Sequence, residues 1–208
     1  MQRNRCELQQ ETKVSALPRT NFLCGKGAQV RAALRVVAFV LCCAAQCWGT
    51  AFAGGEVQAG HDVTKLPPEV QRMRQAILQA AMSGDIERLR VPIEMNEIPP
   101  LFAKAPTKDP IAYLKSVSAD GNGREMLAIL YNLLTTGYAI TNPGTKNEMV
   151  VWPYHAAIPL KELDPGQEVE IYRFLPPARL KEMIAQGKYS YYSVGIGRDG
   201  VWHYFTAQ

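Results

Sequence analysis

A short apolar run near the start of the chain constrains its fold most, because it separates a leader from the part that can form a domain. Residues 36–47 are almost entirely apolar, and they follow two basic residues, Arg31 and Arg35. The sequence Ala51-Phe52-Ala53 comes soon after this run. A basic flank, an apolar run of about a dozen residues and a small-x-small site form the three-part pattern of a secretory signal peptide. The pattern predicts export, cleavage after Ala53 and a periplasmic or secreted product.

A membrane-spanning or buried helix is the alternative interpretation of the same run. A span needs about 20 apolar residues, and this run is shorter, so we expect no stable membrane span after cleavage. Residues 1–30 are polar and patternless, and translation starts either at Met1 or near Val30. The predicted organisation is an N-terminal extension and signal peptide over 1–53, a flexible tail over 54–65 and one globular domain over 66–208.

The distribution of cysteines and charges agrees with this division. All five cysteines precede Ala53, so the predicted mature part has no disulfide and no thiol nucleophile: Cys6, Cys24, Cys42, Cys43 and Cys47. The formal charge of +4 is also misleading, because the first 53 residues contain seven Lys/Arg and two Asp/Glu. The remainder contains sixteen Lys/Arg and seventeen Asp/Glu, a net charge of −1. This balance argues against nucleic-acid binding, which needs an excess of basic side chains.

The first half of the predicted domain shows helical periodicity. Apolar residues at spacings of three and four predict an amphipathic helix that ends at Gly84: Val70, Met73, Ile77 and Ala81. A second short helix is expected over 85–90.

Residues 80–89 resemble the helix–turn–helix joint of an ankyrin-type repeat. The resemblance covers about ten residues and has no second copy, whereas a solenoid needs about three stacked repeats, so we interpret this segment as an ordinary helical hairpin.

Further helices are expected at three capped positions. Asp109-Pro110 opens one, and Asn122 with Glu125 is a capping pair for the strongest helical pattern in the chain. That helix is predicted to be the central core helix and to end at Gly137, with a stripe of Met126, Ile129, Leu130, Leu133 and Leu134. Asp164-Pro165 favours a helix through Leu175, and Pro176-Pro177 opens another that ends at Gly187.

The second half also contains strand signals. Met149–Trp152 is a short strand candidate, and Tyr189–Ile196 and Val201–Thr206 flank the turn Gly197-Arg198-Asp199-Gly200. Asp-Gly favours a hairpin because both residues tolerate a positive φ. The predicted class is α+β: four to six helices, mostly N-terminal, with a small C-terminal antiparallel sheet or hairpin in one domain.

The chemistry-bearing residues exclude some kinds of site. The three histidines, His61, His155 and His203, have no metal-ligand spacing, and the mature part has no cysteine, so we expect no metal and no cofactor. No Gly-x-Ser-x-Gly motif occurs. A hydrolase is still possible if His155 or His203 converges with a carboxylate from this set: Glu148, Glu162, Asp164, Glu168 and Glu170.

Two aromatic clusters indicate a binding surface. They supply the candidate ligand-binding residues Trp152, Tyr154, His155, Tyr191, Trp202 and His203. Because side chains alternate along a strand, Trp202 and Tyr204 should share one face of the hairpin, and His203 and Phe205 the other. One set packs on the helices, and an exposed set can stack on sugar rings or hold a peptide. The alternative is that these aromatic residues cover a small core with their hydroxyl groups at its rim.

Val151-Trp152-Pro153-Tyr154 and the ending Gly200-Val201-Trp202-His203-Tyr204-Phe205 resemble a group of uncharacterised exported bacterial proteins. The resemblance covers most of the predicted mature part and implies no function and no residue role. The sequence therefore predicts an exported, non-catalytic binding or interaction module of the cell envelope, with glycan or peptide as partner. The alternatives are an envelope hydrolase that uses Asp or Glu with His155 or His203, and a purely structural protein-interaction domain.

Overall fold

Five strands form one antiparallel sheet in the part of the chain that the computed structural model describes, residues 57–208. The strands lie side by side in chain order: β1 (Val57–Gly60), β2 (Tyr138–Thr141), β3 (Met149–Trp152), β4 (Tyr192–Gly197) and β5 (Trp202–Ala207). The predicted signal peptide, the cleavage after Ala53 and the start near Val30 lie outside the described residues. The predicted α+β class is confirmed.

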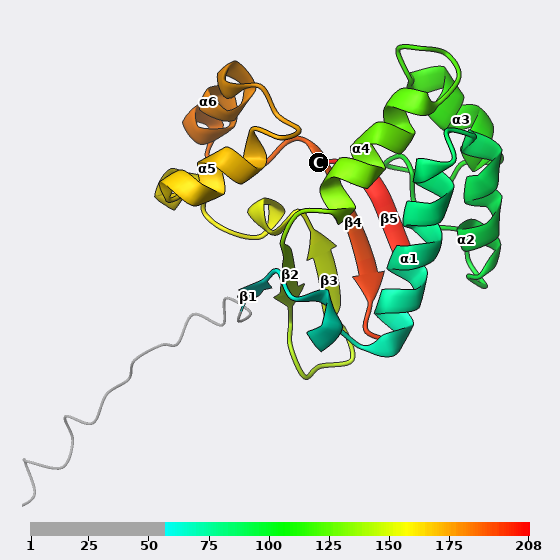
Figure 1. Ribbon diagram of the computed structural model, residues 1–208, viewed down its shortest axis with the longest axis horizontal. Helices are drawn as coiled ribbons and strands as arrows, with labels where there is room; N and C mark the ends of the chain where they lie inside the picture. The colour runs from blue at the N-terminus through cyan, green and yellow to red at the C-terminus, as the bar shows by residue number, and fades with distance from the viewer. Residues whose placement is uncertain (1–56) are drawn as a thin grey trace, which may run out of the picture. The chain divides into compact units, whose positions relative to one another are not determined.

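Two long helices cover one face of this sheet (Figure 1). α1 (Pro68–Met82) and α4 (Arg124–Leu134) pack against each other and against β4. Their apolar faces meet the inward side chains of the strands, among them Val150, Val194 and Ile196, in one core cluster. The burial of this apolar surface is the main stabilising contribution of the fold.

The helical stripes expected from the sequence are buried as predicted. Val70, Met73, Ile77 and Ala81 are all buried on α1, and the five predicted residues of α4 are buried as well. Two shorter helices complete this half, α2 (Arg90–Glu94) and α3 (Pro110–Val117). The Asp109 carboxylate caps α3, since its Oδ1 accepts hydrogen bonds from the backbone N–H groups of Ile111 and Ala112.

A second, smaller helical group lies between β3 and β4 in the chain. It contains α5 (Pro165–Ile171) and α6 (Pro177–Gln186), preceded by two short 3-10 turns at Tyr154–Ala156 and Leu160–Glu162. A complete capping box between Asp164 and Gln167 opens α5 and confirms the predicted helix start. These elements enclose their own apolar cluster, and Phe174 and Tyr191 pack against both this cluster and the main core.

The sheet is larger than the sequence predicted. The expected flexible tail over 54–65 is wrong for its described part, because residues 57–60 form β1 and residues 63–65 form a 3-10 turn. β1 is mostly exposed and has no apolar pattern, but it pairs with β2 in the register Val57↔Thr141 to Gly60↔Tyr138. Its position is therefore set by a strand about 80 residues later in the sequence.

Two local predictions are also corrected. Asn122 does not cap α4. The N-cap is Gly123, and the Glu125 carboxylate accepts from the Ala119 N–H instead. In the β4–β5 turn only Gly200 has a positive φ, and the Asp199 Oδ1 accepts a hydrogen bond from the Val201 N–H. The Asp-Gly turn forms as expected, but its Asp contributes a side-chain hydrogen bond rather than an unusual backbone conformation.

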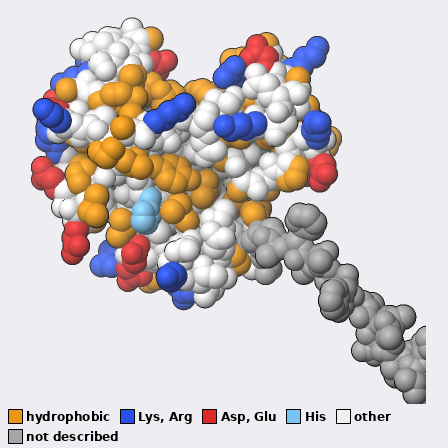
Figure 2. All heavy atoms as spheres, turned by 180° about the vertical axis from the view of Figure 1, so that it is seen from behind, with side chains coloured by type: hydrophobic (Ala, Val, Ile, Leu, Met, Phe, Trp, Pro, Cys, Tyr) orange, Lys and Arg blue, Asp and Glu red, His pale blue; other side chains and the backbone are white. Residues whose placement is uncertain are grey.

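Hydrophobic side chains also gather over a wide area seen from behind the view of Figure 1 (Figure 2). Among residues 57–208, no helix is both long enough and apolar enough to cross a bilayer.

The packing of α4 gives a direct test of the core. Met126 on α4 is 2% exposed, whereas Met82 at the end of α1 is 71% exposed. We expect Met126→Ala to lower the free energy of unfolding by about 3 kcal/mol, because the truncation leaves a cavity. Met82→Ala should change it by less than about 0.5 kcal/mol. Chemical denaturation of the two variants checks this, and equal losses would show that α4 does not pack as described.

Candidate functional site

Four of the six residues predicted to form an aromatic binding surface lie inside the protein. Trp152, His155 and Trp202 are 0% exposed, and Tyr154 is 2% exposed. Because they are buried, they cannot stack on an external sugar ring, and they belong to the packed interior. Trp202 packs edge-on against Phe102 with ring centroids 5.3 Å apart.

A β-bulge explains why the predicted faces of β5 were wrong. The register of β4 and β5 shifts between Gly195 and Ile196, so Ile196 pairs with Trp202 while Gly195 pairs with Tyr204. This shift interrupts the alternation, and Trp202 and Phe205 both point into the core.

The other two candidates lie in different places. Tyr191 is partly buried between the two apolar clusters, where its ring stacks on Phe174 at a centroid distance of 6.0 Å. His203 is exposed at the hairpin end of β5. The structure therefore does not join the six predicted residues into one surface, and only His203 lines a large open cavity.

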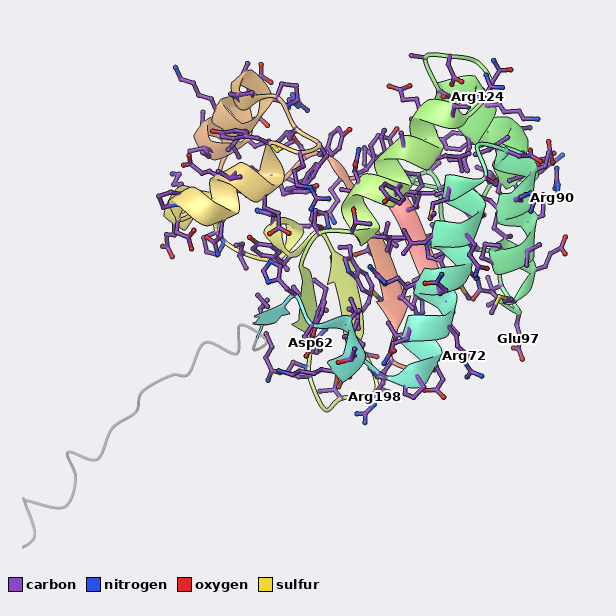
Figure 3. The ribbon with its side chains drawn as sticks, in the orientation of Figure 1. Asp62, Arg72, Arg90, Glu97, Arg124 and Arg198 are labelled. Carbon is purple, nitrogen blue, oxygen red and sulfur yellow. The ribbon has the colours of Figure 1, made fainter. Side chains whose placement is uncertain are left out.

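That cavity, which we call the turn-end cleft, lies where the β2–β3 and β4–β5 turns meet the first turn of α1. It has a volume of about 740 Å³ and is lined by Glu69, Asn142, residues 145–149, residues 197–199 and His203. Arg198, labelled in Figure 3, marks this end of the sheet. The lining carries both signs of charge but no aromatic side chain other than the His203 imidazole.

The walls of the turn-end cleft are fixed by their own hydrogen bonds. The Glu148 Oε2 accepts a hydrogen bond from the Gly144 N–H at 2.6 Å, and Arg198 reaches the same oxygen at 3.5 Å. The Thr145 hydroxyl donates to the Asn142 carbonyl at 2.9 Å. These bonds hold the β2–β3 turn against the β4–β5 turn before any ligand arrives.

Two other polar groups of the cleft, on Lys146 and His203, make no such hydrogen bond within residues 57–208. Among the described residues, neither the Lys146 ammonium nor the His203 ring has a hydrogen-bond or ion-pair partner. Gly197 separates two of the lining groups, since a Cβ there would lie 2.6 Å from the Asp199 Oδ1 and 2.8 Å from the His203 Nε2. Because Gly197 has no side chain, the space between the Asp199 carboxylate and the His203 imidazole stays open.

A second group of polar side chains surrounds Glu170 on α5. The His61 Nε2 lies 3.0 Å from the Glu170 Oε2, and the Gly137 N–H donates to the Glu170 Oε1 at 2.8 Å. The Tyr154 ring packs edge-on against His61 with centroids 5.5 Å apart. A side chain at position 137 would collide with both rings. A cavity of about 300 Å³ lies beside this group.

Burial and hydrogen bonding act in opposite directions on the pKa of Glu170. Burial raises it, but the hydrogen bonds from His61, the Gly137 N–H and Tyr154 outweigh burial, and the pKa is lowered. The pKa of Tyr154 is raised, first by burial and then by the negative charge of Glu170. Glu170 is therefore a carboxylate and Tyr154 a phenol at neutral pH.

His155 lies next to this group and is neutral. Its Nε2 lies 3.0 Å from the Gln167 carbonyl, which can only accept, so this nitrogen carries the proton. Its Nδ1 has no partner among the described residues, and burial lowers the pKa of the ring. The ring stacks on Tyr154 at 4.0 Å. His155 is thus a buried histidine of the protein interior.

The pairing of His61 with Glu170 could not be found from the sequence. The two residues are 109 positions apart, and His61 was assigned to a flexible tail. Neither residue lies in a motif. His61 directly follows β1, and the pairing of β1 with β2 places it near α5.

Within residues 57–208, no three side chains of the His, Cys, Asp and Glu types are arranged to hold a metal ion.

Comparison of the chain with models of protein families, with curated proteins and with solved structures found no match. The resemblance to exported bacterial proteins therefore stays a prediction.

The hydrogen bonds of Glu170 predict a measurable loss of stability. Glu170→Gln removes the charge that the Gly137 N–H and His61 bind, and we expect the free energy of unfolding to fall by about 2 kcal/mol. Glu162→Gln is the matched control, since Glu162 is exposed and makes no ion pair with a described residue. Urea denaturation compares the two variants. An unchanged stability in Glu170→Gln would mean that the carboxylate is not needed to fix α5.

The neutral state of His155 predicts acid sensitivity. In the unfolded chain histidine titrates near pH 6.5, whereas the folded pKa is lower. The unfolded state therefore binds the proton first, and the free energy of unfolding should fall as the pH drops below about 6.5. This fall should be much smaller in His155→Gln and should persist in His203→Gln, where the exposed ring is changed. Thermal unfolding at pH 7.5, 6.5 and 5.5 provides the measurement, and parallel curves for all three proteins would contradict the assignment.

Proposed function

We propose that this chain is a non-catalytic binding module of the cell envelope and that the turn-end cleft takes a short polar peptide. The observation that supports it most is the open cleft of about 740 Å³, whose walls are already hydrogen-bonded while Lys146 and His203 are unused. Pre-formed concave sites with a few convergent polar groups are the usual form of a binding site. Export rests on the signal-peptide pattern of residues 31–53.

The lining favours a peptide over a glycan. Sugars are commonly held by stacking on an aromatic ring, and no tryptophan or tyrosine of residues 57–208 lines the cleft. The cleft instead offers Lys146 and Arg198 beside Glu69, Glu148 and Asp199. A ligand that carries both a carboxylate and an ammonium group matches this mixture of charges.

The same lining favours binding over catalysis. A hydrolase needs a nucleophile or an activated water beside a base. In the cleft the Thr145 hydroxyl donates to the Asn142 carbonyl, and the Asp199 Oδ1 accepts from the Val201 N–H. The hydroxyl and the carboxylate oxygen that a hydrolase would use here are thus engaged in holding the turns.

A hydrolase is the second candidate because carboxylates do converge with histidines. His203 lines the turn-end cleft together with Asp199, and His61 pairs with Glu170 at 3.0 Å beside a smaller cavity. A carboxylate-paired imidazole is a common general base. The sequence named either His155 or His203 for this role; His155 is buried, whereas His203 is exposed.

The binding proposal is tested by titrating the full chain with the tetrapeptide Ala-Glu-Lys-Ala in a calorimeter. We expect binding that weakens at least about tenfold in Lys146→Glu, since one reversed charge is repelled by the ligand carboxylate. His203→Ala should also weaken it. Lys161→Glu, on an exposed 3-10 turn away from the cleft, is the matched control and should bind as the wild type does.

Two results would contradict the proposal. If the peptide did not bind at millimolar concentration, or if Lys146→Glu bound it as tightly as the wild type does, the mixed-charge cleft would not be the site. The peptide recovered after the titration is also weighed by mass spectrometry. An intact peptide supports a binding module, and cleaved fragments would favour the hydrolase.

A further inference from the structure

The outer edge of β5 is only partly covered by the chain itself. Leu101 forms a parallel bridge beside Tyr204, in which its N–H donates to the His203 carbonyl at 2.9 Å. Its carbonyl accepts from the Phe205 N–H at 2.8 Å. One residue of a sixth strand is thus in place on this edge.

The backbone groups that follow on this edge are not paired by the described residues. The backbone N–H and C=O groups of successive strand residues point alternately to the two sides of the strand. On the outer side of β5 these are the backbone groups of His203, Phe205 and Ala207. Leu101 forms hydrogen bonds with the His203 carbonyl and the Phe205 N–H. The Phe205 carbonyl and the Ala207 N–H make no hydrogen bond with residues 57–208. An open acceptor and an open donor therefore lie on this edge beyond the bridge, where an added strand can pair with them.

A cavity of about 310 Å³ lies at this position, between the chain after Leu101 and the end of β5. Its apolar part is formed by Leu101, Ala103, Tyr204 and Ala207. Leu101 is 41% exposed although it is a large apolar side chain. Lys104 is the charged side chain of the lining, which contains no acidic side chain.

We propose that this edge binds the carboxyl-terminal end of an extended peptide from another protein, independently of the turn-end cleft. The peptide enters from the Ala207 end, runs antiparallel to β5 and stops before Leu101, so that it bonds to the Ala207 N–H and the Phe205 carbonyl. Its last side chain is apolar and lies against Leu101 and Ala103, and its terminal carboxylate pairs with Lys104. Strand addition of this kind takes its affinity from main-chain hydrogen bonds and its specificity from side-chain pockets.

A second copy of this chain fits the edge less well. Two β5 strands related by a two-fold axis would pair over several residues, but Leu101 already occupies the middle of the edge in each copy.

The test uses the full chain and a fluorescein-labelled pentapeptide, Thr-Thr-Val-Thr-Leu, with a free terminal carboxylate. We expect saturable binding by fluorescence anisotropy, and at least about tenfold weaker binding of the same peptide as its C-terminal amide. Lys104→Glu should weaken binding by a similar factor. Lys108→Glu makes the same charge change on the same loop outside the cavity and should leave the affinity at the wild-type value.

The backbone contact is tested at Ala207. Ala207→Pro removes the outward N–H, and because that N–H does not pair with β4, the edge strand tolerates the change. It should bind the peptide at least about tenfold more weakly than Ala207→Val, which retains the donor. Amide exchange of Ala207, followed by NMR in the wild type, should slow when the peptide saturates the protein.

Three results would overturn this inference. The first is no binding at millimolar peptide. The second is equal affinity of the Ala207→Pro and Ala207→Val variants together with an unprotected Ala207 amide. The third is a dimer in sedimentation that Ala207→Pro dissociates, which would assign the edge to a second copy. The cleft experiment uses a different, polar peptide, so either proposal can fail while the other stands.

Discussion

The Glu170 carboxylate connects three segments that lie far apart in the sequence, and the arrangement of the smaller helical group depends on it. One of its oxygens accepts the Gly137 N–H between α4 and β2, and the other pairs with His61 after β1. A partly buried carboxylate is unfavourable unless such partners satisfy it. The fold therefore gains these contacts together or loses them together, which couples α5 to the end of the core helix and to the edge of the sheet.

The contacts around Glu170 also explain why Tyr154 and His155 are buried and not part of an exposed surface. Tyr154 packs against His61 and interacts with Glu170, and His155 stacks on Tyr154 while it donates to the Gln167 carbonyl. These rings fill the space where α5 meets the sheet. These clustered aromatic residues are buried here, and the two sites that we propose lie at the ends and the edge of the strands.

The sequence predicted what local patterns determine. The stripes of α1 and α4 and the caps Asp109 and Asp164 follow from residues within a few positions of one another. It failed where the determinant is distant, as in β1, which has no apolar pattern and is placed by its pairing with β2. It failed too where one extra residue changes a register, because the bulge opposite Gly195 places both Trp202 and Phe205 in the core.

The turn-end cleft and the edge of β5 share a strand but use different atoms of it. At His203 the side chain lines the cleft, while the backbone carbonyl accepts from Leu101 on the edge. Because the imidazole and the carbonyl point in different directions, a ligand in the cleft need not displace the Leu101 bridge, and a peptide on the edge need not move the imidazole. The strand is also held on its other side by β4 and by the core residues Trp202 and Phe205, so it presents both sets of groups from a fixed position. The two proposed ligands can therefore occupy the strand at the same time without competing for the same atoms.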